Sequence, residues 1–282
     1  MPRMYRFVVT DVFTDVPLAG NQLAVFTDAR GLTDDQMQAL ACEIGFSETT
    51  FVLPAEGDAD IRMRIFTPAR ELPFAGHPTL GTAFVVGGPL QRMVVRIETG
   101  RGVVPVALER EGARIVFGRM EQPLPSQEPY AHTDELVAAL GVSGSILPVE
   151  LYDNGTPHLY VMLESDAEVA AVTPDFARLG ALVGPAGVSC FAADGLRVKT
   201  RMFAPELGVF EDPATGSAAG PLAVHLARHG RIGWGEEIEI AQGAEIGRPS
   251  TLYATAEGGP DAATRVEVGG SAVIVARGEF SV

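Results

Sequence analysis

Short runs in which apolar and polar residues alternate dominate the chain, and they predict a protein built mainly from β-strands. The clearest runs in the first half are residues 6–13, 23–26, 50–53, 61–66, 93–98, 103–108 and 114–117. Those in the second half are residues 149–152, 159–163, 188–192, 196–203, 237–240 and 265–268. Most of these runs have the period of two that is typical of a half-buried sheet.

Helical patterns are fewer. Thr33 with Gln36 three residues later has the form of a capping box, and Gly45 fits the C-terminal end of the helix that follows. Residues 78–86 and 217–229 are apolar on nearly every side, which is typical of buried helices. We therefore expect an α+β fold in which a sheet rolls around a central helix.

One arrangement of residues occurs twice. Phe66–Pro68 leads into Ala75–Gly81, and Phe203–Pro205 leads at the same distance into Asp212–Ala218. Each copy is a strand-like run that ends in Phe-x-Pro, crosses a short loop and enters a Gly-rich helix start. The copies lie 203 − 66 = 137 residues apart, almost half of the 282 residues, which indicates a duplicated domain.

This duplication predicts two pseudo-symmetric lobes, residues 1–125 and 126–282, with a small-anion site in a cleft between them. The alternative that the last strand crosses back to the first lobe stays open. The Pro- and Gln-rich segment 121–129 is the best candidate for a linker.

The composition excludes several classes of protein. The net charge is −15, and Lys199 is the only lysine, which argues against nucleic-acid binding and leaves one residue for a pyridoxal phosphate Schiff base. Lys199 lies in an alternating strand pattern, where a solvated strand face is the better interpretation. No apolar run approaches the ~20 residues of a membrane helix. Residues 1–6 lead directly into a strand without a signal-peptide pattern, so we expect a cytoplasmic location.

The segment from Asp212 to Gly220 is the first candidate for chemistry. Its small residues let backbone N–H groups approach a ligand, and the helix dipole favours a negative charge there. No lysine follows the second glycine, so it is not a Walker A loop. Asp, Thr and Ser are also ordinary helix caps, but the matching Gly76–Thr79 segment in the first half favours a ligand site.

Glu48 and His77 are the candidates for proton transfer. Glu48 enters an apolar strand, where partial desolvation would raise the pKa of its carboxyl group toward neutrality. A solvated turn is the alternative for Glu48. His77 follows Gly76 at the first helix start, where it could relay a proton or serve only as a capping or buried histidine.

The other histidines and the cysteines are weaker candidates for a functional role. His225 and His229 have the spacing of a zinc-binding helix, but Leu226 replaces the expected glutamate and no third ligand is evident nearby. Cys42 and Cys190 are interpreted as packing residues.

These segments together resemble the phenazine-biosynthesis isomerase family, called PhzF-like. The matching segments, in family order, are Asp11–Phe13 with Gly20 and Asn21, Ser47–Thr49, Phe66–Pro68 with Gly76–Leu80, and Glu211–Ser217. The resemblance implies a diaminopimelate-epimerase-like fold with the active site between two lobes. It also implies a homodimer, a small carboxylate substrate, and no metal or organic cofactor.

The resemblance further assigns roles to residues. It implies that Glu48 is the acid/base group, with His77, Asp212 and Ser217 as its catalytic partners. Backbone groups at Gly76, His77, Gly216 and Ser217 would hold the substrate carboxylate, and Asn21 and Thr215 are further candidates for the cleft. The family prototype isomerises trans-2,3-dihydro-3-hydroxyanthranilate, with the glutamate moving a proton from C3 to C1 of the ring.

Related epimerases and proline racemases use two thiols, one from each lobe. The repeat places Ala75 opposite Asp212, and neither is Cys, so a single-carboxylate proton shift is favoured. Two alternatives stay open. One is an epimerase or racemase of an amino or hydroxy acid that uses carboxylates, and the other is a non-catalytic binding protein that keeps the cleft.

Overall fold

The computed structural model describes residues 3–282, which form two compact units. Unit 1 contains the residues up to Glu121 together with Gly269–Val282, and unit 2 contains Gln122–Val268. Met1 and Pro2 lie outside the described residues. They are part of residues 1–6, for which the sequence predicts no signal peptide. No helix in the described part of the chain is long and apolar enough to span a bilayer.

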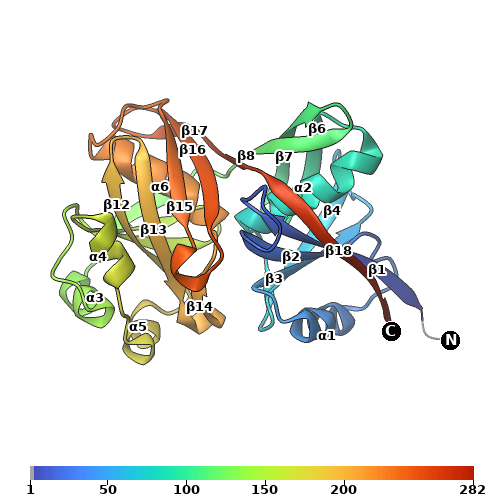
Figure 1. Cartoon of the computed structure of the whole chain (residues 1–282), viewed down its shortest axis with the longest axis horizontal. Helices are drawn as coiled ribbons and strands as arrows, with labels where there is room; N and C mark the ends of the chain where they lie inside the picture. The colour runs from blue at the N-terminus through green and yellow to red at the C-terminus, as the bar shows by residue number, and fades with distance from the viewer. Residues whose placement is uncertain (1–2) are drawn as a thin grey trace. The chain divides into compact units, whose positions relative to one another are not determined.

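Unit 1 is a strand-rich body with two helices, coloured blue to green in Figure 1 except for its red last strand. Its helices are α1 (Asp34–Ile44) and α2 (Gly76–Leu90). Its strands are β1 (Met4–Val12), β2 (Asn21–Phe26), β3 (Glu48–Leu53), β4 (Ile61–Phe66), β5 (Glu71–Leu72), β6 (Val94–Thr99), β7 (Gly102–Glu111), β8 (Arg114–Glu121) and β18 (Ala272–Ser281).

Unit 2 is also rich in strands and contains two more α-helices than unit 1. Its α-helices are α3 (Thr133–Leu140), α4 (Asp166–Ala171), α5 (Phe176–Val183) and α6 (Gly216–Arg228), with short 3₁₀ turns at Pro205–Leu207 and Ala244–Ile246. Its strands are β9 (Ser126–Pro129), β10 (Glu150–Asp153), β11 (Pro157–Met162), β12 (Gly187–Asp194), β13 (Arg197–Ala204), β14 (Val209–Asp212), β15 (Glu237–Gln242), β16 (Ser250–Gly258) and β17 (Ala263–Gly270).

The two units share one pattern of strand pairing, which alternates between antiparallel and parallel. In unit 1 the pairs are β1–β2, β2–β3, β3–β4, β4–β6 and β6–β7, of which the second and fourth are parallel. In unit 2 the pairs β10–β11, β11–β12, β12–β13, β13–β15 and β15–β16 follow the same order of directions. An outer strand, β18 or β9, pairs antiparallel with the first strand of each set. The predicted α+β fold and its duplication are therefore confirmed.

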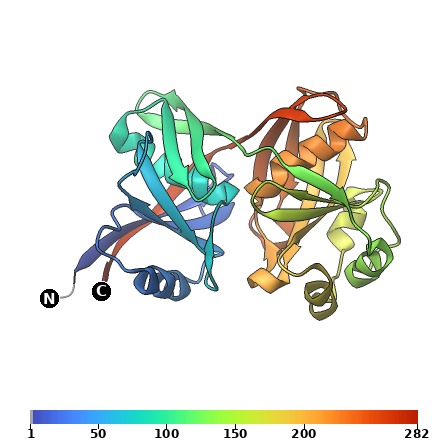
Figure 2. The same ribbon diagram turned by 180° about the vertical axis from the view of Figure 1, so that it is seen from behind.

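Each unit wraps its strands around one apolar helix. Helix α2 contacts β1, β2, β3, β6, β7 and β8, and it is buried from Gly76 to Gly87. Helix α6 contacts β15 and β16 and is buried from Gly216 to Ala227. Figure 2 shows both helices from behind, each with strands of its own unit around it. The apolar surface on all sides of these helices is what lets them occupy a core.

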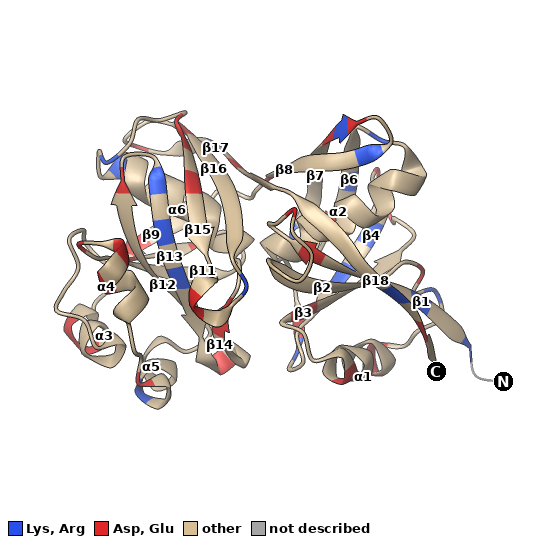
Figure 3. Ribbon diagram, in the orientation of Figure 1, with Lys and Arg blue, Asp and Glu red and all other residues tan. Residues whose placement is uncertain are grey.

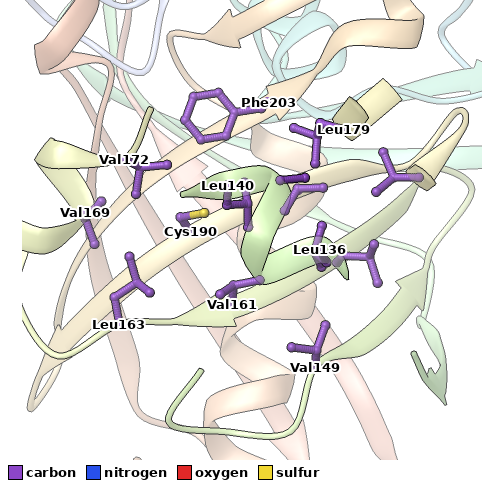
Figure 4. Packing of buried hydrophobic residues seen from close by; sticks show 14 of the residues in the cluster. Leu136, Leu140, Val149, Val161, Leu163, Val169, Val172, Leu179, Cys190 and Phe203 are labelled. Carbon is purple, nitrogen blue, oxygen red and sulfur yellow. The ribbon is translucent and has the colours of Figure 1, made fainter. Parts of the chain in front are cut away.

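A second apolar layer in unit 2 lies where α3, α4 and α5 cover the sheet, and Figure 4 shows its packing. Leu136 and Leu140 from α3, Val169 from α4 and Leu179 from α5 are buried there together with Cys190. Burial raises the pKa of the Cys190 thiol to about 12, so this cysteine is a packing residue, as predicted.

Helix α1 has the ends that its sequence predicts. The Thr33 hydroxyl accepts from the Gln36 backbone N–H at 3.2 Å, and the Gln36 side chain accepts from the Thr33 N–H at 3.0 Å. Gly45 ends the helix in the left-handed conformation with φ 71°. Met37, Leu40 and Ala41 are buried, so this side of the helix packs against the rest of unit 1.

Two expectations need correction. The predicted linker 121–129 contains the boundary between the two units, after Glu121, but it is shorter than expected, because Ser126–Pro129 forms strand β9, paired with β10. All four residues of β9 are exposed, so backbone pairing forms the strand without an apolar pattern to reveal it.

Lys199 is not fully solvated either. Lys and Arg occupy alternate positions along β13 (Figure 3), and the Lys199 ammonium pairs with Glu245 at 2.6 Å with 17% of its side chain exposed.

Close packing around α2 yields a matched pair of predictions. A Cβ on Gly81 would lie 2.6 Å from the Val12 side chain and 2.7 Å from Leu23, whereas a Cβ on Gly88 of the same helix meets no atom within 4 Å. We expect Gly81→Ala to lower the free energy of unfolding by about 1–3 kcal/mol through overpacking. Gly88→Ala should raise it by up to about 1 kcal/mol through helix propensity. Urea denaturation of both variants measures this, and equal effects would contradict the packing around α2.

Candidate active site

The two buried helices begin without a side-chain cap. Neither Ala75, the N-cap of α2, nor Thr215, the N-cap of α6, caps its helix with a side-chain hydrogen bond. The α1, α4 and α5 helices are capped by Thr33, Ser165 and Asp175, whereas α3, whose N-cap residue is exposed, also has no side-chain cap. The first N–H groups of a helix need partners, and a ligand can supply them where no side chain does. Both helix starts therefore have the features of an anion-binding site.

These helix starts also correct the repeat alignment. The Phe-x-Pro segments are 137 residues apart, but the helices begin at Gly76 and Gly216, which are 140 apart. Ala75 is therefore equivalent to Thr215 rather than to Asp212, and three additional residues precede the second helix. Neither Ala75 nor Thr215 carries a thiol, so a two-thiol mechanism at these positions is excluded on the corrected alignment as well.

In unit 1, a carboxylate and an imidazole meet at the start of α2. Glu48 begins β3, and its Oε2 lies 3.5 Å from Nε2 of His77, the second residue of α2. The Asn21 amide Nδ2 lies 3.3 Å from the other ring nitrogen, Nδ1, and the Ser47 hydroxyl donates to Asn21 Oδ1 at 3.3 Å. The Glu48 and His77 side chains are both largely enclosed, with 15% and 4% exposed.

Burial determines the charge of His77. Desolvation lowers the pKa of the imidazole to about 3, although a hydrogen bond with the Gln22 backbone acts in the opposite direction. His77 is therefore neutral near pH 7. At 3.5 Å it faces the Glu48 carboxylate as a neutral ring rather than as a cation.

In unit 2, an amide side chain holds the loop that precedes α6. Thr215 donates its hydroxyl to Asp212 Oδ2 at 2.7 Å. The Gln242 amide donates to the Asp212 carbonyl at 2.8 Å and to Thr215 Oγ1 at 2.9 Å, and it accepts from the Thr215 N–H at 3.1 Å. Because these groups are buried, the loop conformation between Asp212 and the helix start is fixed.

A second set of polar side chains holds the first turn of α6. Ser217 Oγ lies 3.0 Å from His158 Nε2, and Asn154 donates its amide to the Ser217 carbonyl at 2.9 Å. Gln122 donates to the Gly216 carbonyl at 2.7 Å. Burial lowers the pKa of His158 to about 4, partly offset by the charge of Asp153, so His158 is neutral near pH 7.

The predicted site residues thus fall into two clusters, one in each unit. Asn21, Glu48, Gly76 and His77 belong to the cluster of unit 1, and Asp212, Thr215, Gly216 and Ser217 belong to the cluster of unit 2. Sequence reasoning missed four residues that support unit 2, namely Gln122, Asn154, His158 and Gln242. No local motif marked His158, because its partner Ser217 is 59 residues away in the chain.

His225 and His229 have a neighbour that their spacing did not reveal. Glu150 Oε2, on β10, lies 3.2 Å from His225 Nδ1 and 3.0 Å from His229 Nε2. The same oxygen accepts from Arg228 at 3.1 Å and from the Tyr152 hydroxyl at 2.8 Å. Burial alone would raise the pKa of Glu150, but these hydrogen bonds and the Arg228 charge hold it well below its usual range. The guanidinium supplies the positive charge at this carboxylate, so we interpret the cluster as a structural network.

Comparison with known proteins gives a consistent result. The family model for phenazine biosynthesis-like proteins, PhzC-PhzF, matches residues 10–278. The chain is 50% identical to trans-2,3-dihydro-3-hydroxyanthranilate isomerase of Pseudomonas aeruginosa over 275 residues, which cover 98% of this chain and 99% of that protein.

Two solved structures show the same fold. A PhzF-family phenazine biosynthesis protein of Bacillus anthracis superposes with a TM-score of 0.87 at 26% identity, covering 99% of this chain and 100% of the other. A hydroxyproline epimerase of Agrobacterium vitis superposes with a TM-score of 0.69 at 14% identity, covering 100% of this chain and 94% of the other, which shows the shared fold alone.

Two of the buried histidines, His77 and His158, should make the stability of the protein depend on pH. The pKa values of His77 and His158 in the folded chain, about 3 and about 4, lie below the value of about 6.5 expected when unfolded. As pH falls below about 6.5, the unfolded chain binds protons that the folded chain does not, so stability is lost. Each histidine should account for up to about 2 kcal/mol of the loss between pH 7 and pH 5.

Urea denaturation at pH 7 and at pH 5 measures this loss. The variants His77→Gln and His158→Gln should each lose less stability between the two pH values than the unmodified protein does. A pH dependence that neither substitution changes would show that these side chains are not buried as neutral groups.

Proposed function

The chain belongs to the phenazine biosynthesis-like (PhzF) family and is an isomerase, and from that premise we propose that it isomerises trans-2,3-dihydro-3-hydroxyanthranilate by a proton shift through Glu48. The substrate is supported by the name of the Pseudomonas aeruginosa relative, which is 50% identical over nearly the full length of both chains. The observation that carries the proposed mechanism is the Glu48 carboxylate, which lies 3.5 Å from the neutral His77 at an uncapped helix start.

In this proposal Glu48 removes the proton from C3 of the ring. The electron pair of that C–H bond moves into the ring, the double bonds shift, and Glu48 returns the proton to C1. One proton leaves and one proton is added, so the reaction is redox-neutral and needs no electron acceptor. We accordingly propose a mechanism without a metal or an organic cofactor. His77 would orient the carboxylate while staying neutral.

The substrate carboxylate would be bound by backbone N–H groups. We propose that Gly76 and His77 at the start of α2, and Gly216 and Ser217 at the start of α6, serve this role. The absence of a side-chain cap at both helices supports it, because their first N–H groups can then point at a ligand. Asp212 would assist proton transfer, with its carboxylate held in place by Thr215.

An epimerase or racemase that uses carboxylates is the second candidate. The shared fold with a hydroxyproline epimerase does not by itself favour it, because the identity is 14%. Exchange of an α-hydrogen with inversion, but without a shift of double bonds, would distinguish this reaction. A homodimer and a cytoplasmic location remain predictions from the sequence.

The direct test is proton NMR of trans-2,3-dihydro-3-hydroxyanthranilate in D₂O with the purified protein. We expect loss of the diene signals and incorporation of deuterium at C1. Glu48→Gln should lower turnover by at least about 100-fold, because a general base typically contributes 10²–10⁴-fold. The same variant should still bind 3-hydroxyanthranilate, measured by calorimetry, because it keeps the shape of the side chain.

Glu43→Gln is the matched control, since Glu43 is an exposed glutamate on α1. It should leave turnover unchanged. Full activity in Glu48→Gln would refute the role of Glu48, and the absence of any reaction in the unmodified protein would refute the substrate.

A further inference from the structure

The His158 ring occupies a space that a glycine leaves open. His158 lies on β11, is 1% exposed, and pairs with Gly187 of the parallel strand β12. A Cβ on Gly187 would lie 2.7 Å from His158 Nδ1 and 3.1 Å from Met202 Sδ. The imidazole therefore lies against the Gly187 backbone, and this contact fixes the ring so that Nε2 meets Ser217 Oγ at 3.0 Å.

Strand register shows which residues are equivalent in the two units. Thr49 pairs with Phe66 and Val188 pairs with Phe203, so Glu48 and Gly187, one residue earlier, are equivalent. Leu23 pairs with Glu48 as His158 pairs with Gly187, so Leu23 and His158 are equivalent.

The second residues of α2 and α6, His77 and Ser217, are also equivalent. Each unit thus places one imidazole beside the start of its buried helix. In unit 1 the imidazole of His77 is on the helix and its partner Glu48 is on a strand. In unit 2 the imidazole of His158 is on a strand and its partner Ser217 is on the helix. At the second residue of the buried helix, unit 2 therefore has a hydroxyl where unit 1 has an imidazole.

The surroundings of the His158 ring favour one of its two tautomers. His158 Nδ1 is buried and has no hydrogen-bond partner, whereas Nε2 faces the Ser217 hydroxyl. A proton on Nδ1 would leave a buried N–H donor without an acceptor, which is rare in folded proteins. A proton on Nε2 can instead be donated to Ser217 Oγ.

We propose that His158 is a positioning residue that donates Nε2–H to Ser217 Oγ and so holds the Ser217 O–H ready to donate to the substrate carboxylate, an inference that rests on the proposed function. A hydroxyl whose oxygen already accepts from His158 uses its own proton for another acceptor. Ser217 then adds a side-chain donor to the backbone N–H groups at the start of α6. The site is thereby set to bind a hydrogen-bond acceptor such as a carboxylate.

The first test does not depend on turnover. Nitrogen-15 NMR of the histidine-labelled, unmodified protein at pH 7 reports which ring nitrogen carries the proton, with His158→Gln used to assign the signals. We expect a proton on Nε2 and an unprotonated Nδ1. A proton on Nδ1 would overturn the proposal, because Ser217 would then donate to His158 instead of to the substrate.

The second test separates positioning from structural support. His158→Leu introduces the residue that the equivalent position of unit 1 carries, and His158→Gln keeps an N–H donor near the place of Nε2. We expect Ser217→Ala and His158→Leu each to raise KM and the dissociation constant of 3-hydroxyanthranilate by about 10- to 100-fold, the effect of one hydrogen bond to a charged group. His158→Gln should recover most of that loss.

The double variant His158→Leu/Ser217→Ala should bind no more weakly than Ser217→Ala alone, because His158 acts through Ser217. Independent, additive losses in the double variant would overturn the proposal. The dissociation constants decide this outcome even if the protein does not isomerise trans-2,3-dihydro-3-hydroxyanthranilate. Failure of the proposed function and failure of this inference are therefore distinguishable.

Discussion

The start of a buried helix is the constraint on which this structure depends. A helix inside a sheet must hold its apolar surface in the core, yet its first N–H groups still require hydrogen-bond partners. The chain meets this requirement with side-chain caps at Thr33, Ser165 and Asp175, whose helices begin near the surface. At α2 and α6 it has no side-chain cap, although both helix starts are buried. We therefore propose the two glycine-led helix starts as the places where an anionic ligand binds.

The net charge of the protein alone would predict that it repels an anionic ligand. The protein carries a net charge of −15, and its acidic residues are spread over both units (Figure 3). Such a surface does not attract a carboxylate, so the proposed binding relies on local dipoles that are fixed in direction. Buried neutral groups fit this requirement. His77 and His158 bring hydrogen-bonding nitrogens to the helix starts without adding charge, and amide side chains hold the first turn of α6 in place.

The parts of the structure that depend on local sequence could be predicted, and the parts that depend on long-range register could not. The capping box of Thr33 and Gln36 and the apolar helices are patterns within short segments, and the structure confirms them. The duplication could be predicted because such short patterns recur in the same order, and the matching strand pairings confirm it. Strand β9, Ser126–Pro129, has no apolar pattern because only its backbone is paired. His158 and Gln122 reach the start of α6 across 59 and 94 residues of chain, so no local motif marks them. The motifs thus identified the two helix starts but not the side chains that position them.

The proposed function requires that uncapped helix starts, rather than charged side chains, bind the ligand carboxylate. An amide NMR titration of the nitrogen-15-labelled protein with 3-hydroxyanthranilate tests this most directly. We expect the amides of Gly76, His77, Gly216 and Ser217 to shift during the titration, while those in the first turns of α1 and α5 stay in place. Binding that leaves these four amides unchanged would contradict it.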